Sequence, residues 1–204
     1  GRLDIGFTGS MVYRDMPRTV RLFGERAPGI EVHLREMSSS EQIEALLHGQ
    51  LHAGFVNLSA VPPRLRQLPL ADDHFVCCLP DGHALAHAPS VALTALAQES
   101  FVMFARDVAP ANHDNVIALF HRAGIHPRTR HGARQWLTVV SLVALGMGVA
   151  LVPASLAQAG VQGVRFVPIA GPRHPTVGVL AWHEEADAPA LHVFLECALS
   201  TIGA

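Results

Sequence analysis

The sequence predicts an α/β protein of two lobes, and three observations support this expectation. The first 56 residues alternate between strand-like and helix-like patterns in the order β-α-β-α-β. The second half of the chain has its own α/β alternation. The chain crosses between the halves twice, near Asp72 and near Val164, so we expect lobes at 1–71 plus 170–204 and at 72–169. Two crossing segments form a hinge, and ligands prefer the cleft between such lobes.

The composition indicates a folded globular protein without a nucleic-acid-binding surface. Hydrophobic residues make up 50% of the 204 residues and charged residues 16%. The net charge is −2 and the sequence contains no lysine, which excludes lysine Schiff-base chemistry and a P-loop. Adjacent Cys77 and Cys78, with Cys197 far away, favour a reducing compartment and therefore the cytoplasm. No apolar run approaches the ~20 residues of a membrane span, and no signal peptide is seen.

The first element is a strand over Arg2–Phe7 that leads directly into a helix. Gly9 permits a sharp exit, and Ser10 stands where the N-cap of a helix over Met11–Arg26 would stand. The spacing of Val12, Met16, Val20 and Phe23 gives that helix an apolar face. A strand that feeds a helix N-terminus offers free N–H groups to an anion. The alternative is that Ser10 only caps its helix.

A second strand and helix place another serine at the same edge. Residues 30–37 alternate as a strand, and the Ser39 to Gln42 spacing predicts a capping box for a helix that buries Ile43, Leu46 and Leu47. Residues 51–56 form the next strand. Because parallel strands end at one sheet edge, Ser10 and Ser39 are expected to converge there.

The remaining elements continue the alternation to the end of the chain. Strands are expected at 65–70, 75–79, 101–104, 127–131, 149–152, 164–169 and 176–182, and helices at 93–97, 112–123, 137–145 and 188–199.

Several patterns resemble catalytic or metal sites but have a simpler interpretation. His83 and His87 are four apart, yet the prolines and glycine around them argue against one helix, so no metal site is expected. Asp72-Asp73 suits a turn at the hinge better than a catalytic pair. The Gly146-Met147-Gly148 run follows a helix and precedes a strand, which suits a helix C-cap and not a dinucleotide loop.

Seven segments, in order over essentially the whole chain, resemble the effector-binding (regulatory) domain of LysR-type transcriptional regulators. They are Leu3–Phe7, Pro28–Val32, Glu36–Gln42, Leu51–Phe55, Leu79–Ala86, Val143–Pro153 and Leu180–Trp182. The Gly-Phe-Thr-Gly-Ser and Gly-Met-Gly-Val-Ala-Leu-Val-Pro runs are most similar to the branch that controls aromatic-compound catabolism, including benzoate- and muconate-responsive regulators.

The resemblance implies a two-lobed periplasmic-binding-protein-like (type 2) fold with a small inducer in the cleft. It further implies a homodimer or homotetramer that meets DNA and RNA polymerase only through a full-length regulator with an N-terminal winged helix-turn-helix. Neither membrane nor cofactor is implied. The implied effector-binding residues are Ser10, Met11, Ser38, Ser39, Asn57, Phe104, Ala111, Asn112 and Trp136.

Three of these positions carry qualifications. Asn57 falls where muconate and benzoate responders carry arginine, which puts a dianionic inducer in doubt; the alternative is that Asn57 is only a turn residue after its strand. Phe104 and Trp136 could serve the core or a pocket, and a bulky Trp136 favours a smaller or flatter ligand.

Two other functions compete with the regulatory one. A periplasmic-type solute-binding protein for a small anion would share the fold but would need an export signal. A bilobal enzyme would need an acid, base or nucleophile in the cleft, whereas the expected pocket holds hydroxyls, an amide and apolar side chains. We therefore expect no catalytic residues.

Overall fold

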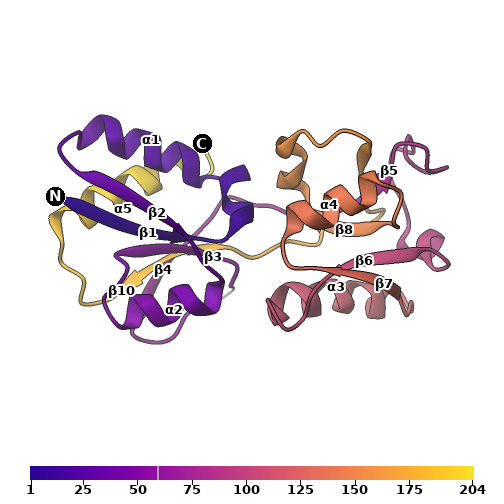
Figure 1. Ribbon diagram of the computed structural model, residues 1–204, viewed down its shortest axis with the longest axis horizontal. Coiled ribbons are helices and arrows are strands. Elements are labelled where there is room, and N and C mark those ends of the chain that lie inside the picture. The colour runs from indigo at the N-terminus through magenta and orange to yellow at the C-terminus, as the bar shows by residue number, and fades with distance from the viewer. Residues whose placement is uncertain (59) are drawn as a thin grey trace. The chain divides into compact units, whose positions relative to one another are not determined.

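The computed structural model describes residues 1–58 and 60–204 and contains two compact α/β units (Figure 1). Unit 1 comprises Gly1–Asp72 and Val177–Ala204, and unit 2 comprises Asp73–Thr176. The first boundary lies beside the expected one, but the second follows Thr176 and not residue 169. The reason is that the returning chain stays bound to unit 2, since Thr176 N–H donates to Asp73 O at 2.9 Å.

Unit 1 contains a five-stranded sheet in the order β2-β1-β3-β10-β4. β1 pairs in parallel with β2 and β3, whereas β10 runs antiparallel to β3 and β4. The parallel trio confirms the β-α-β-α-β prediction and brings the carboxyl ends of three strands to one edge. The strands are β1 (Arg2–Phe7), β2 (Glu31–Glu36), β3 (Ala53–Val56), β4 (Leu65–Pro69) and β10 (Val179–His183).

Helices α1 (Met16–Arg26) and α5 (Pro189–Thr201) cover one face of this sheet (Figure 1). Their core is apolar, and the Phe23 and Phe194 rings meet edge-to-face with centroids 5.5 Å apart.

The expectation of one helix over Met11–Arg26 is wrong. Residues Gly9–Tyr13 form a separate 3-10 turn, η1, and α1 begins only at Met16. Pro17 in its first turn explains the start, because proline fits the first turn of a helix but breaks its interior. Val12 is accordingly exposed, while Met11 is fully buried.

Helix α2 (Ser39–Leu47) covers the opposite face (Figure 1). Its fully buried Gln42 lies against Gly6 and Gly54, where an added Cβ would fall 2.8 and 2.6 Å from Gln42 Oε1. A side chain at either position would therefore displace the buried Gln42 amide. Leu46 is buried as predicted, but Ile43 and Leu47 are only half-buried, since the buried stripe runs through Gln42 and Ala45.

Unit 2 contains two small sheets that Val149 joins. β5 lies between β8 and β9, antiparallel to both, and β6 pairs in parallel with β7. Val149 bridges Phe101 in parallel, so β6 lies beside the start of β8. The strands are β5 (Phe75–Pro80), β6 (Ser100–Phe104), β7 (Arg128–Ala133), β8 (Ala150–Pro153) and β9 (Val164–Pro168).

Helix α3 (Pro110–Arg122) and helix α4 (Trp136–Ala144) pack on opposite faces of β6 (Figure 1). Phe101 meets Phe120 of α3 with ring centroids 4.6 Å apart, and Phe104 meets Trp136 of α4 at 5.0 Å. The short 3-10 helices are η2 (Leu93–Leu96) and η3 (Ala154–Ala159).

The end of α4 confirms the predicted C-cap. Gly146 has φ +77°, its N–H donates to Val143 O at 2.9 Å, and Met147 N–H donates to Leu142 O at 3.1 Å. These two bonds are the Schellman motif. The glycine pair therefore ends a helix and does not cradle a phosphate.

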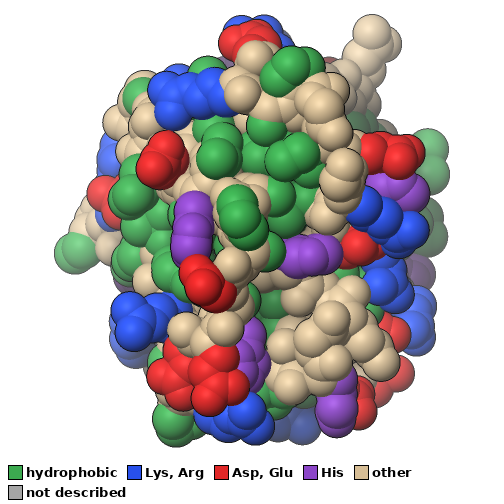
Figure 2. Space-filling model, turned by 90° about the vertical axis from the view of Figure 1, so that its left-hand side faces the viewer, with side chains coloured by type: hydrophobic (Ala, Val, Ile, Leu, Met, Phe, Trp, Pro, Cys, Tyr) green, Lys and Arg blue, Asp and Glu red, His purple; other side chains and the backbone are tan. Residues whose placement is uncertain are grey.

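The surface is mixed in character. On the face shown in Figure 2, acidic, basic and histidine side chains are interspersed among apolar ones. Among the described residues, no helix combines the length and apolar character that a membrane span requires.

Candidate functional site

The strongest candidate site in unit 1 lies where β1 and β3 end and α2 begins. The Asn57 backbone N–H donates to Ser39 Oγ at 3.0 Å, and Asn57 Nδ2 donates to Thr8 Oγ1 at 3.0 Å. Thr8 N–H donates to Phe55 O at 3.2 Å, which holds the loop after β1 against β3. Three short polar side chains from three consecutive chain segments therefore meet at one sheet edge. We call Thr8, Ser39 and Asn57 the strand-end triad.

The hydrogen bonds of the strand-end triad decide what this edge can bind. Ser39 Oγ and Thr8 Oγ1 both accept, so each hydroxyl proton is available to another partner. Ser39 and Ser40 open α2, and their backbone N–H groups have no acceptor within the described part of the chain. The edge thus presents neutral donors beside the positive end of a helix, an arrangement that favours an anionic acceptor such as a carboxylate.

The α2 capping box is shifted by one residue from the predicted register. Ser38, not Ser39, is the N-cap: its Oγ accepts from Glu41 N–H at 3.2 Å, and its N–H donates to Glu41 Oε2 at 2.7 Å. The Ser38 N–H lowers the pKa of the Glu41 carboxyl below its ordinary value. Ser38 is therefore occupied in capping, and Ser39 is left to serve the strand-end triad.

Ser10 does not cap a helix as predicted, since it lies inside η1, whose N-cap position is Thr8. Its half-buried hydroxyl has no partner among the described residues, which leaves it available to a ligand. The neighbouring Met11 is 0% exposed and packs with Leu3 and Ile5, so its side chain serves the core of unit 1.

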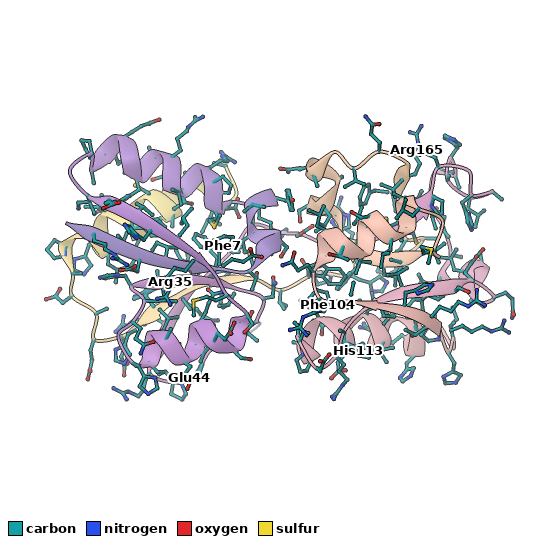
Figure 3. The ribbon with its side chains drawn as sticks, in the orientation of Figure 1. Phe7, Arg35, Glu44, Phe104, His113 and Arg165 are labelled. Atoms are coloured by element: carbon teal, nitrogen blue, oxygen red, sulfur yellow. The ribbon has the colours of Figure 1, made fainter. Side chains whose placement is uncertain are left out.

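The predicted residues of unit 2 gather where β6 ends and where α3 and α4 begin (Figure 3 labels Phe104 and, on α3, His113). Phe104 and Trp136 are 7% and 6% exposed, and their rings contact each other, so both are mainly packing residues. Ala111 is exposed and Asn112 half-buried in the first turn of α3. The effector-contacting roles of these four residues stay predictions.

An ion pair supports the loop that leads into α3. Arg106 Nε and Nη2 donate to the two carboxylate oxygens of Asp114 at 2.9 and 3.0 Å. The Arg106 hydrogen bond, helped by His113, lowers the pKa of Asp114 to about 2. This exposed ion pair joins residues 106 and 114, on either side of Ala111 and Asn112.

The other reactive side chains have structural roles. Burial raises the pKa of Cys77 and of Cys78 to about 12, which keeps both thiols protonated and unreactive. Asp73 accepts from the Ser155 hydroxyl at 2.6 Å and from Ser155 N–H at 3.2 Å, consistent with a turn residue at the unit boundary. His83 Nδ1 accepts from Leu85 N–H at 3.1 Å, and its Nε2 lies 2.9 Å from Glu99 Oε1. No grouping of three metal-binding side chains occurs in the described parts of the chain.

The fold is that of a two-unit α/β domain with polar side chains at its strand ends, and comparisons with known proteins identify its family. The sequence profile described as the LysR substrate binding domain matches residues 1–202. The HTH-type transcriptional regulator IlvR of Caulobacter vibrioides is 36% identical over 202 residues. That alignment covers 96% of this chain and 66% of IlvR, so the chain spans just under two thirds of that relative. The chain belongs to the LysR substrate-binding domain family.

Solved structures agree with this assignment. The effector-binding domain of BenM, a regulator of Acinetobacter baylyi, solved with its effector benzoate, superimposes with a TM-score of 0.86 at 25% identity. That match covers 98% of this chain and 90% of the BenM chain. Full-length CbnR complexed with its target DNA matches with a TM-score of 0.88 at 26% identity, over 100% of this chain and 72% of that one. The fold is therefore the type 2 periplasmic-binding-protein-like fold of these domains.

Sequence reasoning missed Thr8. A polar residue immediately after a buried parallel strand is a signal for a site at a sheet edge, and Thr8 has this position. The neighbouring Gly9-Ser10 pair carries the more familiar signal of a helix start. Thr8 and Asn57 are separated by 49 residues in the sequence, so their hydrogen bond is visible only in the folded chain.

Proposed function

We propose that this chain is the effector-sensing domain of a LysR-type bacterial transcriptional regulator and that it binds a small carboxylate. The observation that carries the proposal is the likeness to the BenM domain, solved with benzoate, over 98% of the chain. The family assignment over residues 1–202 favours this function over a free-standing solute-binding protein.

The chemistry of unit 1 supports a carboxylate as the recognised group. The Ser10, Ser39 and Thr8 hydroxyls and the first N–H groups of α2 are all neutral donors. Hydrogen bonds to a charged group contribute about 1.5–3 kcal/mol each, so two or three suffice to hold one carboxylate. We propose Ser38 and Met11 as supporting residues, through the α2 cap and the core beneath η1. Phe104, Ala111, Asn112 and Trp136 remain the proposed contacts from unit 2.

The rest of the regulator follows from the relatives. IlvR extends well beyond the matched region, and CbnR was solved on its target DNA. We propose that a winged helix-turn-helix in the full-length protein binds DNA and contacts RNA polymerase, with homodimers or homotetramers as the working unit, in the cytoplasm. The sensing domain itself performs no catalysis, in line with relatives that are transcriptional regulators.

The proposal is tested by ligand-dependent stabilisation. A thermal-shift screen with benzoate and other small carboxylates should raise the melting temperature of the wild-type domain, because a ligand at 100 times its Kd stabilises by ~2.7 kcal/mol. Ser10→Ala and Ser39→Ala should each weaken the best carboxylate by about tenfold to a hundredfold in calorimetry, since each loses one hydrogen bond to the anion.

Ser200→Ala is the matched control. Ser200 lies on the exposed side of α5, where its hydroxyl bonds only to Glu196 O, and its replacement should leave affinity unchanged. Equal affinity in wild type and in both site variants would refute the proposed site. A screen in which no carboxylate stabilises the domain would refute the ligand class.

A further inference from the structure

We infer that Thr8 is a positioning residue that orients the Asn57 amide, and that this amide selects carboxylates which also carry a hydrogen-bond donor. The inference rests on the proposed function of the site and names the class of effector more closely. It is carried by the strand-end triad and by the hydrogen-bonding capacity that the triad leaves unused.

The Asn57 residue is held at both its backbone and its side chain. Its backbone N–H donates to Ser39 Oγ at 3.0 Å, and its Nδ2 donates to Thr8 Oγ1 at 3.0 Å. Thr8 is itself fixed, because its N–H donates to Phe55 O and its carbonyl accepts from Met11 N–H at 2.9 Å. The amide plane of Asn57 is therefore set by a neighbour that cannot move independently of the sheet.

This orientation leaves one acceptor of the triad without a donor. Asn57 Nδ2 faces Thr8, and no group in the described part of the chain donates to Asn57 Oδ1. The buried unpaired side-chain atoms among those residues are His33 Nε2, Gln42 Oε1 and Thr176 Oγ1. Asn57 Oδ1 is not one of them, and Asn57 as a whole is half-buried, so its oxygen remains within reach of a ligand.

An unpaired acceptor beside a carboxylate site imposes a specific demand on the ligand. The carboxylate meets the hydroxyl and N–H donors, whereas Asn57 Oδ1 attracts a hydroxyl, an amide N–H or an ammonium group. A second carboxylate would face a lone pair and no cation. A ligand that covers the amide without donating to it would leave a desolvated acceptor unpaired, which weakens binding. The preferred class is thus a hydroxy- or amino-substituted monocarboxylate.

The Thr8 hydroxyl can be removed by mutation with little change in the shape of the side chain. Thr8→Val keeps the branched side chain but cannot accept from Asn57 Nδ2, so the amide becomes free to turn either end toward the ligand. Thr8→Ser restores an acceptor in the same place. Thr129→Val is the matched control, because Thr129 lies exposed on β7 in unit 2.

The experiment measures affinities for two ligand pairs by calorimetry: hydroxybenzoates against methoxybenzoates, and lactate against 2-methoxypropionate. Within each pair the methoxy compound keeps the oxygen but loses the donor. Wild type and Thr129→Val should prefer the hydroxy compound of the better-binding pair by about tenfold or more, the fold-change that corresponds to ~1.4 kcal/mol. Thr8→Val should reduce this ratio to within about twofold, and Thr8→Ser should recover it.

Retention of the full preference by Thr8→Val would overturn the positioning role, and a wild type without preference would overturn the effector class. If carboxylates bind without discrimination, only this inference fails; if none binds, the proposed function fails with it. Thermal melting, with Thr129→Val as the reference, shows whether Thr8→Val folds. If it does not fold, Thr8→Ala removes the same hydrogen bond with a smaller side chain. The hydroxy-to-methoxy affinity ratios are then measured for Thr8→Ala in the same way.

Discussion

Asn57 occupies its place through its backbone, because its N–H donates to Ser39 Oγ whichever side chain the residue carries. A substitution can therefore change the chemistry at this point without releasing the end of β3. The wild-type asparagine supplies a neutral amide, whereas arginine would supply a fixed positive charge and a two-pronged donor.

We predict that Asn57→Arg shifts preference toward dicarboxylates. The guanidinium can pair with a second carboxylate in a bidentate manner, while the wild type offers that group no cation. Affinities for benzoate and for cis,cis-muconate should be compared in both proteins, and the muconate-to-benzoate ratio should rise at least tenfold in the variant. A ratio that stays within about twofold, a change of under ~0.4 kcal/mol, would make Asn57 only a turn residue.

The individual residues also show the limit of prediction from sequence. Ser10 and Ser39 were expected at one sheet edge, because residues that follow parallel strands must meet there. That Asn57 reaches across to Thr8 could not be predicted, since it depends on the rotamer of one amide over a separation of 49 residues.

At the scale of elements, the first residue of a helix was harder to predict than the presence of the helix. Ser38-Ser39-Ser40-Glu41-Gln42 offers the capping-box spacing twice, once from Ser38 to Glu41 and once from Ser39 to Gln42. The tertiary structure decides between them, because Gln42 is needed beneath Gly6 and Gly54 and Ser39 is needed by Asn57. Local sequence contains neither requirement. The start of α1 was also misplaced, at Met11 and not at Met16, although Pro17 is a local signal for a first helical turn.

We predict that Ser38→Ala lowers the stability of the domain by about 1 kcal/mol, because the Glu41 N–H loses its cap. For a chain of this length the melting temperature should fall by roughly 2–4 °C. Ser40→Ala is the control: this exposed neighbour makes no capping bond, so the same replacement should leave the melting temperature almost unchanged. Equal effects of the two replacements would contradict the Ser38 cap.

At the scale of the whole molecule, the α/β alternation, the parallel trio and the two crossings were all readable from periodicity. The return crossing was placed too early, because residues 174–176 bind back to unit 2 through His174 O and the bridge between His74 and Pro175. Such pairing involves chain segments about 100 residues apart and leaves no local pattern.

Charge is also distributed unequally between the units. Unit 1 contains eight arginines against twelve acidic residues, and unit 2 contains seven arginines against five. The slight excess in unit 2 is partly neutralised by pairs such as Arg106–Asp114 and Arg165–Asp81. Duplex DNA requires a protein to neutralise several phosphates at once, and its affinity falls steeply with salt for that reason.

We therefore predict that this domain alone does not bind duplex DNA at physiological salt. With a net charge of −2 and arginines interrupted by carboxylates, any attraction should be confined to low ionic strength, where the Debye length reaches ~30 Å. Fluorescence anisotropy with a labelled duplex at 0.01 and 0.15 M salt measures this directly, with the full-length regulator as the positive control. Micromolar affinity at 0.15 M with a steep salt slope would instead place a phosphate-binding surface on this domain, and Arg128 and Arg130 of β7, both exposed, would be the first residues to replace.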